Sequence, residues 1–327
     1  MSAEPILSVK DLKVHFPVGG SLIGGGKSLK AVDGVSFDVF PGETLGIVGE
    51  SGSGKSTIGR AVLQLLKPTA GRVAWLGKNI AGFSRGQMKP FRREMQIVFQ
   101  DPLASLNPRM TAGDIIAEPL DTFEPGLSSA ERKARVQEIM GKVGLLPQMI
   151  NRYPHEFSGG QNQRIGIARA MILKPKLIVA DEPVSSLDVS IRAQIINLLA
   201  DLQKEMGVAL MFISHDLAVV RHVSHRVLVL YLGKVMELAD GRVLLTKPRH
   251  PYTQALLSAA PIPDPEVERG KKRILLEGDL PSPLNPPSGC VFRTRCPIAQ
   301  AKCAKEVPAL ESRGGASDHL VACHFPT

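Results

Sequence analysis

Residues 45–57 of the chain read LGIVGESGSGKST, and this stretch decides the fold. Residues 45–48 predict a short buried strand, and a helical pattern begins near Lys55. The loop between them, Gly49-Glu50-Ser51-Gly52-Ser53-Gly54-Lys55-Ser56-Thr57, fits the GxxxxGK[ST] pattern of a phosphate-binding loop. Glycines let backbone N–H groups turn inward around phosphate oxygens, and the helix N-terminus adds partial positive charge. We therefore expect residues 49–57 to bind the phosphates of ATP.

Two side chains of this loop carry specific roles in such a site. Lys55 would reach the β- and γ-phosphates, and the Ser56 hydroxyl would bind Mg²⁺. A second glycine-rich stretch, Gly24-Gly25-Gly26-Lys27-Ser28, fails the pattern because position 21 is serine where glycine is required. It also joins two expected strands rather than a strand to a helix, so we interpret it as an ordinary loop.

The regions around the loop predict an α/β fold with a mostly parallel sheet. Residues 6–16 and 29–40 alternate apolar and polar residues, which is typical of half-buried strands and indicates an antiparallel β-subdomain. After residue 44, apolar strands alternate with helical patterns such as residues 191–206, which favours parallel strands covered by helices. The strands expected in this series are residues 45–48, 95–99, 177–180, 208–213 and 226–232.

Two further segments complete the predicted layout. The stretch from about residue 101 to 165 has helical periodicity, as in residues 128–143, and contains no convincing strand, so we expect a helical insertion. After about residue 261 the chain becomes rich in proline, which marks a boundary. We expect a nucleotide-binding domain over residues 1–260 and a small cysteine-bearing extension over residues 261–327.

An acidic pair follows the strand predicted at residues 177–180. Asp181 and Glu182 would lie at the carboxyl edge of a parallel sheet, where ligands bind in such folds. Asp181 would hold the Mg²⁺ shell, and Glu182 would polarise a water beside the γ-phosphate. Two surface acids opening a turn before Pro183 are the plainer alternative.

Other polar groups are predicted at the same edge. His215 follows the strand at residues 208–213 and would hydrogen-bond the γ-phosphate, although a lone histidine there is more often structural. Gln100 closes the strand at residues 95–99. Ser158 is expected to cap a helix that begins with Gly159 and Gly160, which would form a second anion site. Two phosphate sites of different design suggest one nucleotide held between two protomers.

Taken together, these motifs resemble the ATP-binding subunits of ABC transporters over about residues 6–260. The resemblance makes residues 49–57 Walker A, Gln100 the Q-loop, and residues 177–182 Walker B with Glu182 as the catalytic acid. It makes His215 the switch histidine and implies that Gln100 also ligates Mg²⁺. It places the signature at Ser158, Gly159, Gly160 and Gln161, the D-loop at residues 185–188 ending in Asp188, and an adenine-stacking aromatic at Phe16. Phe16 would serve equally well as a core residue.

Finer features resemble the dipeptide and oligopeptide importers. Residues 98–108, VFQDPLASLNP, and 250–257, HPYTQALL, are similar to segments of that family, and His15-Phe16-Pro17 is similar to its F-type ATPase. That resemblance implies a heterodimer with a second, D-type ATPase, two membrane-spanning permease subunits and an extracytoplasmic solute-binding protein. Asn162 and Ser186 depart from the usual residues, but neither departure removes a catalytic group.

Composition limits the function classes. The chain has 327 residues and 43% hydrophobic content, and it contains neither an apolar run of membrane-spanning length nor a signal-peptide pattern at its start. We expect a peripheral protein on the cytoplasmic face of the cell membrane. The net charge of +9 permits nucleic-acid binding, but the basic residues are scattered, so no nucleic-acid partner is expected.

All four cysteines lie in the last 38 residues: Cys290, Cys296, Cys303 and Cys323. Disulfides are disfavoured in a cytosolic protein, so a metal site is the preferred interpretation. Four thiolates suit Zn²⁺ or an iron–sulfur cluster, although the spacing matches neither a zinc ribbon nor a ferredoxin. The family resemblance favours a [4Fe–4S] cluster, with Zn²⁺ and reduced free thiols as alternatives.

The predicted function is ATP hydrolysis that energises import of short peptides. Import of another small solute, such as nickel or glutathione, remains open. A nucleic-acid- or ribosome-associated ABC ATPase is the alternative from another class, but the long coiled-coil insertion or second cassette typical of those proteins is missing from this sequence. A catalytically inactive regulatory subunit is opposed by the intact acids Asp181 and Glu182.

Overall fold

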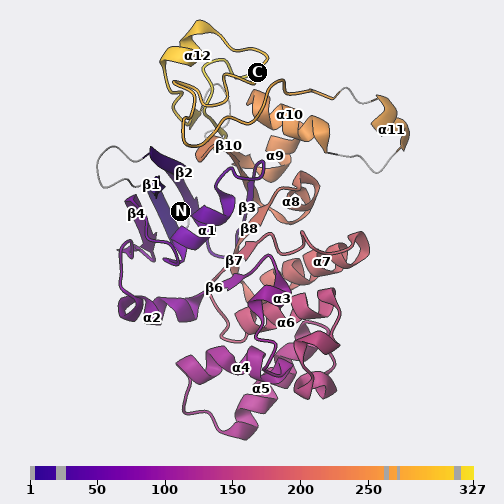
Figure 1. The fold of residues 1–327 in the computed structure, drawn as a ribbon. Coiled ribbons are helices and arrows are strands. Elements are labelled where there is room, and N and C mark those ends of the chain that lie inside the picture. The colour runs from indigo at the N-terminus through magenta and orange to yellow at the C-terminus, as the bar shows by residue number, and fades with distance from the viewer. Residues whose placement is uncertain (1–3, 20–26, 261–264, 271–272, 313–317) are drawn as a thin grey trace. The chain divides into compact units, whose positions relative to one another are not determined.

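The computed structural model describes residues 4–19, 27–260, 265–270, 273–312 and 318–327. The chain divides into two compact units. Unit 1 comprises residues 1–39, 44–82 and 214–327, and unit 2 comprises residues 40–43 and 83–213. Figure 1 labels the helices and strands of both units.

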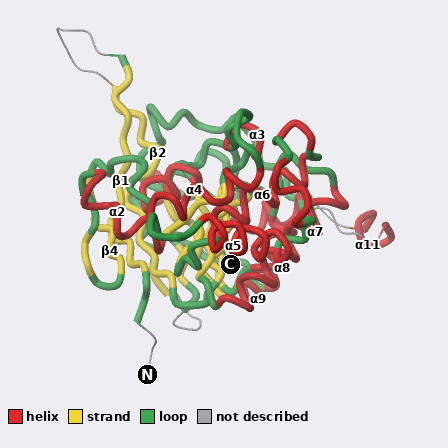
Figure 2. The backbone as a smooth tube through the Cα atoms, turned by 90° about the horizontal axis from the view of Figure 1, so that it is seen from below, coloured by secondary structure: helices red, strands yellow, loops and turns green. Residues whose placement is uncertain are grey.

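Unit 1 contains an antiparallel sheet in the order β2-β1-β4-β5. Its register sets Leu7 opposite Val39 on β2 and opposite Trp75 on β4, and all three side chains are buried. Figure 2 shows β1, β2 and β4 lying side by side. The strands are β1 (Leu7–Val18), β2 (Lys27–Val39), β4 (Ala70–Trp75) and β5 (Lys78–Asn79).

Unit 1 also contributes strands to a second, mostly apolar sheet. β3 pairs in parallel with β9, and β9 pairs antiparallel with β10, which in turn pairs with β12. These strands are β3 (Thr44–Val48), β9 (Arg226–Tyr231), β10 (Lys234–Asp240), β11 (Glu311–Ser312) and β12 (Leu320–Val321). The helices of this unit are α1 (Lys55–Val62), α8 (Leu217–Val223), α9 (Gly241–Thr246), α10 (Pro251–Ala259), α11 (Pro265–Gly270) and α12 (Ala301–Lys305).

Unit 2 holds three parallel strands and a helical region. β6 (Met95–Val98), β7 (Leu177–Asp181) and β8 (Ala209–Ser214) pair in that order, and β7 and β8 are buried throughout. The two 3₁₀ turns of the unit are Pro147–Asn151 and Pro154–Glu156. Its helices are α2 (Arg85–Glu94), α3 (Pro102–Ser105), α4 (Ala112–Phe123), α5 (Ser129–Lys142), α6 (Gly159–Met171) and α7 (Val189–Met206).

Local sequence explains where several of these helices begin and end. Ser128 and Glu131 form a reciprocal capping box at the start of α5, and Gly207 ends α7 with a φ of 63°, a left-handed conformation that glycine adopts without strain. The Pro41-Gly42 pair forms a turn before β3. These local signals define where the elements begin and end.

The predicted α/β fold is confirmed. Every strand and helix proposed from periodicity is present within one or two residues of its expected ends, and the insertion carries α3 to α6 with no strand over residues 101–165. Strands β4, β5, β10, β11 and β12 were not predicted. The glycine-rich stretch at residues 24–28 was interpreted as a loop. Residues 24–26 lie outside the described residues, while Lys27 and Ser28 begin β2. None of the described helices is both long and apolar enough to span a bilayer.

Candidate functional site

The phosphate loop lies between β3 and α1 in unit 1. Gly49 is buried, and a Cβ built on it would lie 2.1 Å from the Leu230 carbonyl oxygen. A Cβ on Gly54, whose φ is 104°, would lie 2.2 Å from the Ala31 carbonyl oxygen. Side chains are thus excluded from two positions, and the backbone can take the tight path that turns N–H groups toward phosphates.

The Lys55 side chain is hydrogen-bonded to the backbone of this loop. Its ammonium donates hydrogen bonds to the Gly49 carbonyl at 2.8 Å and to the Glu50 carbonyl at 3.0 Å. The side chain is buried at the first residue of α1. Ser56 and Thr57 follow on the same turn, half-buried, so their hydroxyls are placed beside the loop rather than inside the core. The roles predicted for Lys55 toward phosphate and for Ser56 toward Mg²⁺ stay predictions.

The acidic pair lies at the carboxyl end of β7 in unit 2. Asp181 is 1% exposed, whereas Glu182 is half-buried and has a φ of 47°. The Glu182 N–H donates to the Ile213 carbonyl at 3.0 Å, and its carbonyl accepts from the Ser185 hydroxyl at 3.1 Å. A left-handed, non-glycine backbone held by two bonds costs free energy that a plain surface turn would not require. The alternative of two unspecialised surface acids is therefore disfavoured.

Gln100 is brought directly to this pair. It follows β6, the neighbour of β7, and its side-chain amide donates to the Glu182 carboxylate at 3.3 Å. Asp101, the next residue, caps α3 by accepting from Ala104 N–H. The first strand of unit 2 and the start of its helical region thus meet at the predicted catalytic acid.

His215 belongs to unit 1 and follows the last residue of β8. It is exposed, and its neighbours Ser214 and Asp216 form a tight turn in which Asp216 caps α8. The histidine is consequently not a core residue. Phe16, also in unit 1, is 38% exposed on β1, so the interpretation of Phe16 as a core residue is wrong.

The signature segment starts α6 in unit 2. Ser158 accepts from the Gln161 N–H at 3.3 Å, while the Gln161 side chain accepts from the Ser158 N–H at 2.9 Å, which forms a capping box. Gly159 is exposed, and a Cβ on Gly160 would lie 2.5 Å from a methyl of Ile191. The two glycines therefore leave a bare backbone at the helix start, as an anion site requires.

Of the two departures from the usual motifs, Asn162 has a structural explanation and Ser186 has none. Asn162 is 1% exposed, and its amide donates to the Pro154 carbonyl at 3.0 Å and to the Phe157 carbonyl at 3.4 Å. It thus ties the preceding 3₁₀ turn to α6. Ser186 gains no contact that explains its identity. Asp188 occupies the N-cap position of α7.

None of the four cysteines forms a disulfide; Cys290, Cys303 and Cys323 are buried and Cys296 is half-buried. Burial, together with the nearby Cys303, Cys323 and Cys296, raises the pKa of the Cys290 thiol to about 11. The thiols are thus neighbours. However, within the described ranges no group of three or more His, Cys, Asp or Glu side chains is arranged to hold a metal ion. The expected [4Fe–4S] or Zn²⁺ centre accordingly has no support from the structure.

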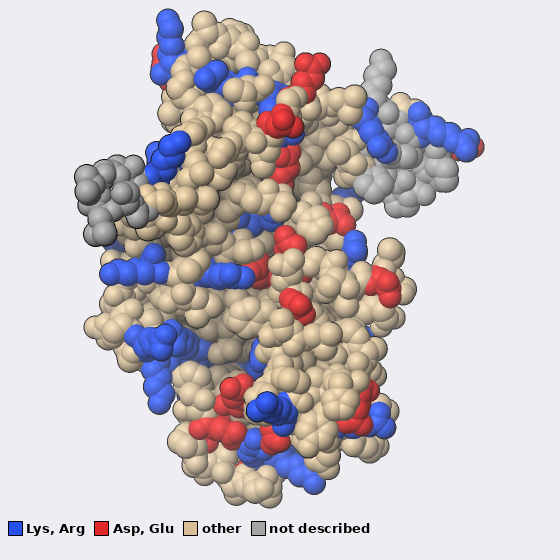
Figure 3. All heavy atoms as spheres, viewed as in Figure 1, with Lys and Arg blue, Asp and Glu red and all other residues tan. Residues whose placement is uncertain are grey.

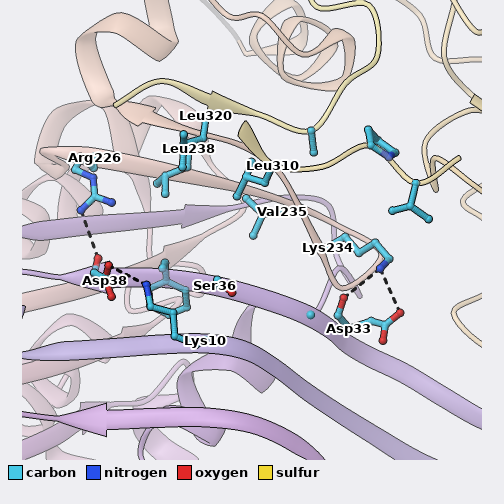
Figure 4. A pocket seen from close by; sticks show the side chains of 15 residues that line it. Lys10, Asp33, Ser36, Asp38, Arg226, Lys234, Val235, Leu238, Leu310 and Leu320 are labelled. Carbon is cyan, nitrogen blue, oxygen red and sulfur yellow. Dashed lines mark hydrogen bonds and ion pairs between the residues drawn. The ribbon is translucent and has the colours of Figure 1, made fainter. Parts of the chain in front are cut away.

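A cavity of about 420 Å³ lies in unit 1 beside β2, β10 and the C-terminal segment. Figure 4 shows its charged side chains engaged with one another: Lys10 with Asp38 at 3.3 Å, and Lys234 with Asp33 at 3.4 Å. The pKa of Asp33 is lowered by Lys234, Lys30 and His15, against the raising effect of its burial. Since these charges compensate each other, we assign no ligand to this cavity.

Contacts of Glu50 were not predicted. Its N–H donates to the Tyr252 hydroxyl at 3.0 Å, and its carboxylate accepts from Arg295. The sequence signal was the HPYT stretch at residues 250–253, which was noted only as part of a family resemblance. Nothing in the pattern around Arg295 linked it to the loop.

The fold and these sites define an ATP-binding cassette. A solved dimer of the cassette MJ0796, described as a post-hydrolysis state bound to ADP and Pi, is 30% identical with a TM-score of 0.65, covering 72% of this chain and 99% of that one. The cbiO1 protein of Clostridium perfringens, described as part of an ABC transporter complex, is 27% identical with a TM-score of 0.65, covering 75% of this chain and 92% of that one.

Matches to family models and to related proteins identify the kind of ATP-binding cassette. Residues 32–185 match the family described as ABC transporter, and residues 236–303 match "Oligopeptide/dipeptide transporter, C-terminal region". The oligopeptide transport ATP-binding protein OppF of Salmonella typhimurium is 60% identical over 321 residues, which cover 97% of this chain and 95% of the relative; OppF of Escherichia coli gives the same values. The chain belongs to the ATP-binding subunits of oligopeptide-type ABC transporters, and it is an ATPase.

Proposed function

We propose that this chain hydrolyses ATP to energise the import of short peptides. The observation that carries the proposal is the 60% identity to two oligopeptide transport ATP-binding proteins, which extends over 97% of the chain and includes the C-terminal region. The substrate class follows from those relatives' names. The residue roles are those predicted from the motifs, and the contacts of the side chains within each unit support them.

The phosphate loop supplies binding and charge compensation. Lys55 exchanges its two loop carbonyls for the β- and γ-phosphate oxygens, and the backbone of residues 49–54 donates to the same phosphates. The Ser56 hydroxyl, Asp181 and Gln100 are the groups that would hold Mg²⁺, and the bound ion would offset the negative charge of the transferred phosphoryl group. Phe16 stacks on the adenine.

The hydrolytic step belongs to Glu182. Its carboxylate, oriented by Gln100, accepts the proton of the attacking water, and His215 hydrogen-bonds the γ-phosphate. The backbone amides of Gly159 and Gly160, with Asp188, face a nucleotide held by a second ATPase subunit. We assign that partner to a non-identical chain, because the opening residues resemble the F-type subunit of a two-ATPase system.

The remaining partners are two permease subunits and an extracytoplasmic solute-binding protein, which place the chain on the cytoplasmic face of the membrane. Both basic and acidic side chains are visible on the face shown in Figure 3. No nucleic-acid partner is proposed, because the basic residues are scattered along the sequence. The finer proposal of a [4Fe–4S] cluster or Zn²⁺ rests on the four neighbouring cysteines alone. Substoichiometric iron and zinc in anaerobically purified protein would remove it.

The function is tested by peptide uptake and by isolation of the complex. Cells that depend on this chain should accumulate a labelled tripeptide, and Glu182→Gln should abolish accumulation while the purified chain still binds ATP. General bases contribute about 10²–10⁴-fold to rates, so loss of turnover should be in that range. Glu138→Gln on the exposed face of α5 is the matched control.

Purification of tagged Glu182→Gln protein from solubilised membranes with ATP and Mg²⁺ should recover two multi-span proteins and a second ATPase. Uptake of nickel or glutathione in place of the tripeptide would retain the transporter and replace its substrate. Recovery of ribosomes or nucleic acid would overturn the transport function.

A further inference from the structure

One ion pair joins the phosphate loop to the C-terminal extension. Nη1 of Arg295 donates to both carboxylate oxygens of Glu50, at 3.1 Å and 2.9 Å. The two residues are 245 positions apart in the chain but belong to the same unit. The Arg295 side chain is 12% exposed and that of Glu50 27%, so this pair is far less screened than an ordinary surface salt bridge.

Glu50 is tethered at three points. Its carboxylate binds Arg295, its N–H donates to the Tyr252 hydroxyl at 3.0 Å, and its carbonyl accepts from Lys55 at 3.0 Å. Burial raises the pKa of the Tyr252 phenol, which stays neutral at physiological pH and keeps its hydroxyl oxygen as an acceptor for that N–H. The second residue of the phosphate loop is therefore positioned by α10 and by the extension as well as by the loop itself.

Arg295 in turn is held in place by aromatic side chains. Its guanidinium lies 6.0 Å from the ring centre of Tyr231, at the end of β9. Tyr231 packs against Tyr252 and Phe292 with ring centres 4.8 Å and 5.3 Å away, and all three rings are completely buried. The Arg295 N–H donates to the Phe292 carbonyl at 3.0 Å. The arginine thus has a fixed direction and little freedom to leave Glu50.

We propose that Arg295 is a positioning residue for ATP binding, which acts by cancelling the charge of Glu50 within the phosphate loop. ATP is a polyanion, and an uncompensated carboxylate in the loop that receives its phosphates would repel it. By supplying the compensating charge from the C-terminal extension, the chain makes its ATP affinity depend on a correctly folded extension. This inference rests on the proposed binding of ATP at residues 49–57.

A titration of the full-length chain with a fluorescent ATP analogue and Mg²⁺ tests the proposal. Arg295→Ala should weaken binding about five- to tenfold, because it leaves a charged acceptor without its donor. Arg295→Lys keeps the charge and should recover most of the affinity. Arg293→Ala is the matched control, since Arg293 lies two residues away and its guanidinium donates to the carbonyl and the hydroxyl of Ser288.

Two further variants separate the charge effect from loss of folding. Glu50→Gln alone should bind within about twofold of wild type, and Glu50→Gln combined with Arg295→Ala should restore binding, since no unpaired carboxylate remains. The deficit of Arg295→Ala should also shrink as salt rises from 50 to 500 mM (roughly 14 to 4 Å in screening length), which a purely structural defect would not show.

Wild-type affinity in Arg295→Ala, or failure of Glu50→Gln to rescue it, would overturn the role of Arg295. If Arg295→Ala does not fold, the affinities of Arg295→Lys and Glu50→Gln for the ATP analogue, and their salt dependence, still test the proposal. The proposed function fails separately: it falls if the wild-type chain does not bind the analogue, or if Lys55→Ala binds it as well as wild type does.

Discussion

The side-chain amide of Gln100 lies 3.3 Å from the carboxylate of Glu182 and donates a hydrogen bond to it. The two residues follow adjacent parallel strands whose register sets Val98 beside Ala180, so the sheet itself brings them together. Gln100 is also the residue from which the helical region of unit 2 begins. A movement of that region that carries Gln100 away would release the Glu182 carboxylate, which links helix position to the hydrolytic step.

Gln100→Ala should lower kcat for ATP about three- to tenfold with little change in KM, because a misoriented base slows the chemical step more than it weakens binding. Steady-state ATPase assays of the purified complex measure this. Gln96→Ala is the control: Gln96 lies on the same strand, but its amide donates to the Arg92 carbonyl at 2.6 Å. Equal losses in the two variants would mean that strand packing, not the Glu182 contact, is responsible.

Gly49→Ala should destabilise the chain by about 2–4 kcal/mol and abolish ATP binding, because its Cβ would lie 2.1 Å from the Leu230 carbonyl oxygen and the backbone must shift. Urea unfolding and the fluorescent ATP titration measure the two effects. Gly141→Ala in α5 meets nothing within 4 Å and should stabilise the chain by about 0.5–1 kcal/mol instead. A tolerated Gly49→Ala would contradict the tight path of the loop.

The predictability of this fold differs between local and long-range features. The strand–loop–helix at residues 44–62 and the Ser158 N-cap of α6 were predicted because each is encoded within one short continuous segment. β10 was missed because Glu237 interrupts the apolar run of residues 234–240, although the Glu237 side chain is completely buried. The contact of Arg295 with Glu50 could not be predicted, since 245 residues separate them and no period connects the two segments.

In the candidate site, too, some features could be predicted from the sequence and others could not. Asp181, Glu182 and Gln100 were predicted as a group because parallel strands end at a common edge. In contrast, the structural role of Asn162 was invisible in the sequence, where it was noticed only as a departure from the usual residue. Its partners are the carbonyls of Pro154 and Phe157, which are exposed to it by a 3₁₀ turn that periodicity does not indicate.

Asn162→Ala should therefore destabilise unit 2 by about 1–3 kcal/mol, because the buried Pro154 carbonyl would lose its side-chain donor. Thermal unfolding measures the loss. Gln194→Ala removes an exposed acceptor of Arg164 at 3.2 Å and should change stability by less than about 0.5 kcal/mol. If Asn162→Ala is as stable as Gln194→Ala, the buried bonds do not hold the start of α6.

His250 predicts an acid-sensitive stability. It is 1% exposed, its Nδ1 accepts from the Tyr252 N–H at 3.0 Å, and burial lowers its pKa to about 3. The unfolded chain binds a proton at this residue below pH 6.5, whereas the folded chain does not until about pH 3. The neutral His250 side chain thus makes its full contribution to the free energy of unfolding above pH 6.5. This contribution decreases as the pH falls, and about 2 kcal/mol of it is lost at pH 5.0.

Unfolding free energies measured by urea at pH 7.5 and 5.0 test this prediction. His250→Asn keeps an acceptor near the position of Nδ1 but cannot be protonated, so its loss of stability between the two pH values should be about 2 kcal/mol smaller than that of wild type. His222→Asn, at an exposed position of α8, is the matched control and should retain the wild-type dependence. An unchanged acid sensitivity in His250→Asn would show that the buried imidazole does not control it and would direct attention to Glu237, which accepts the His250 N–H at 3.1 Å.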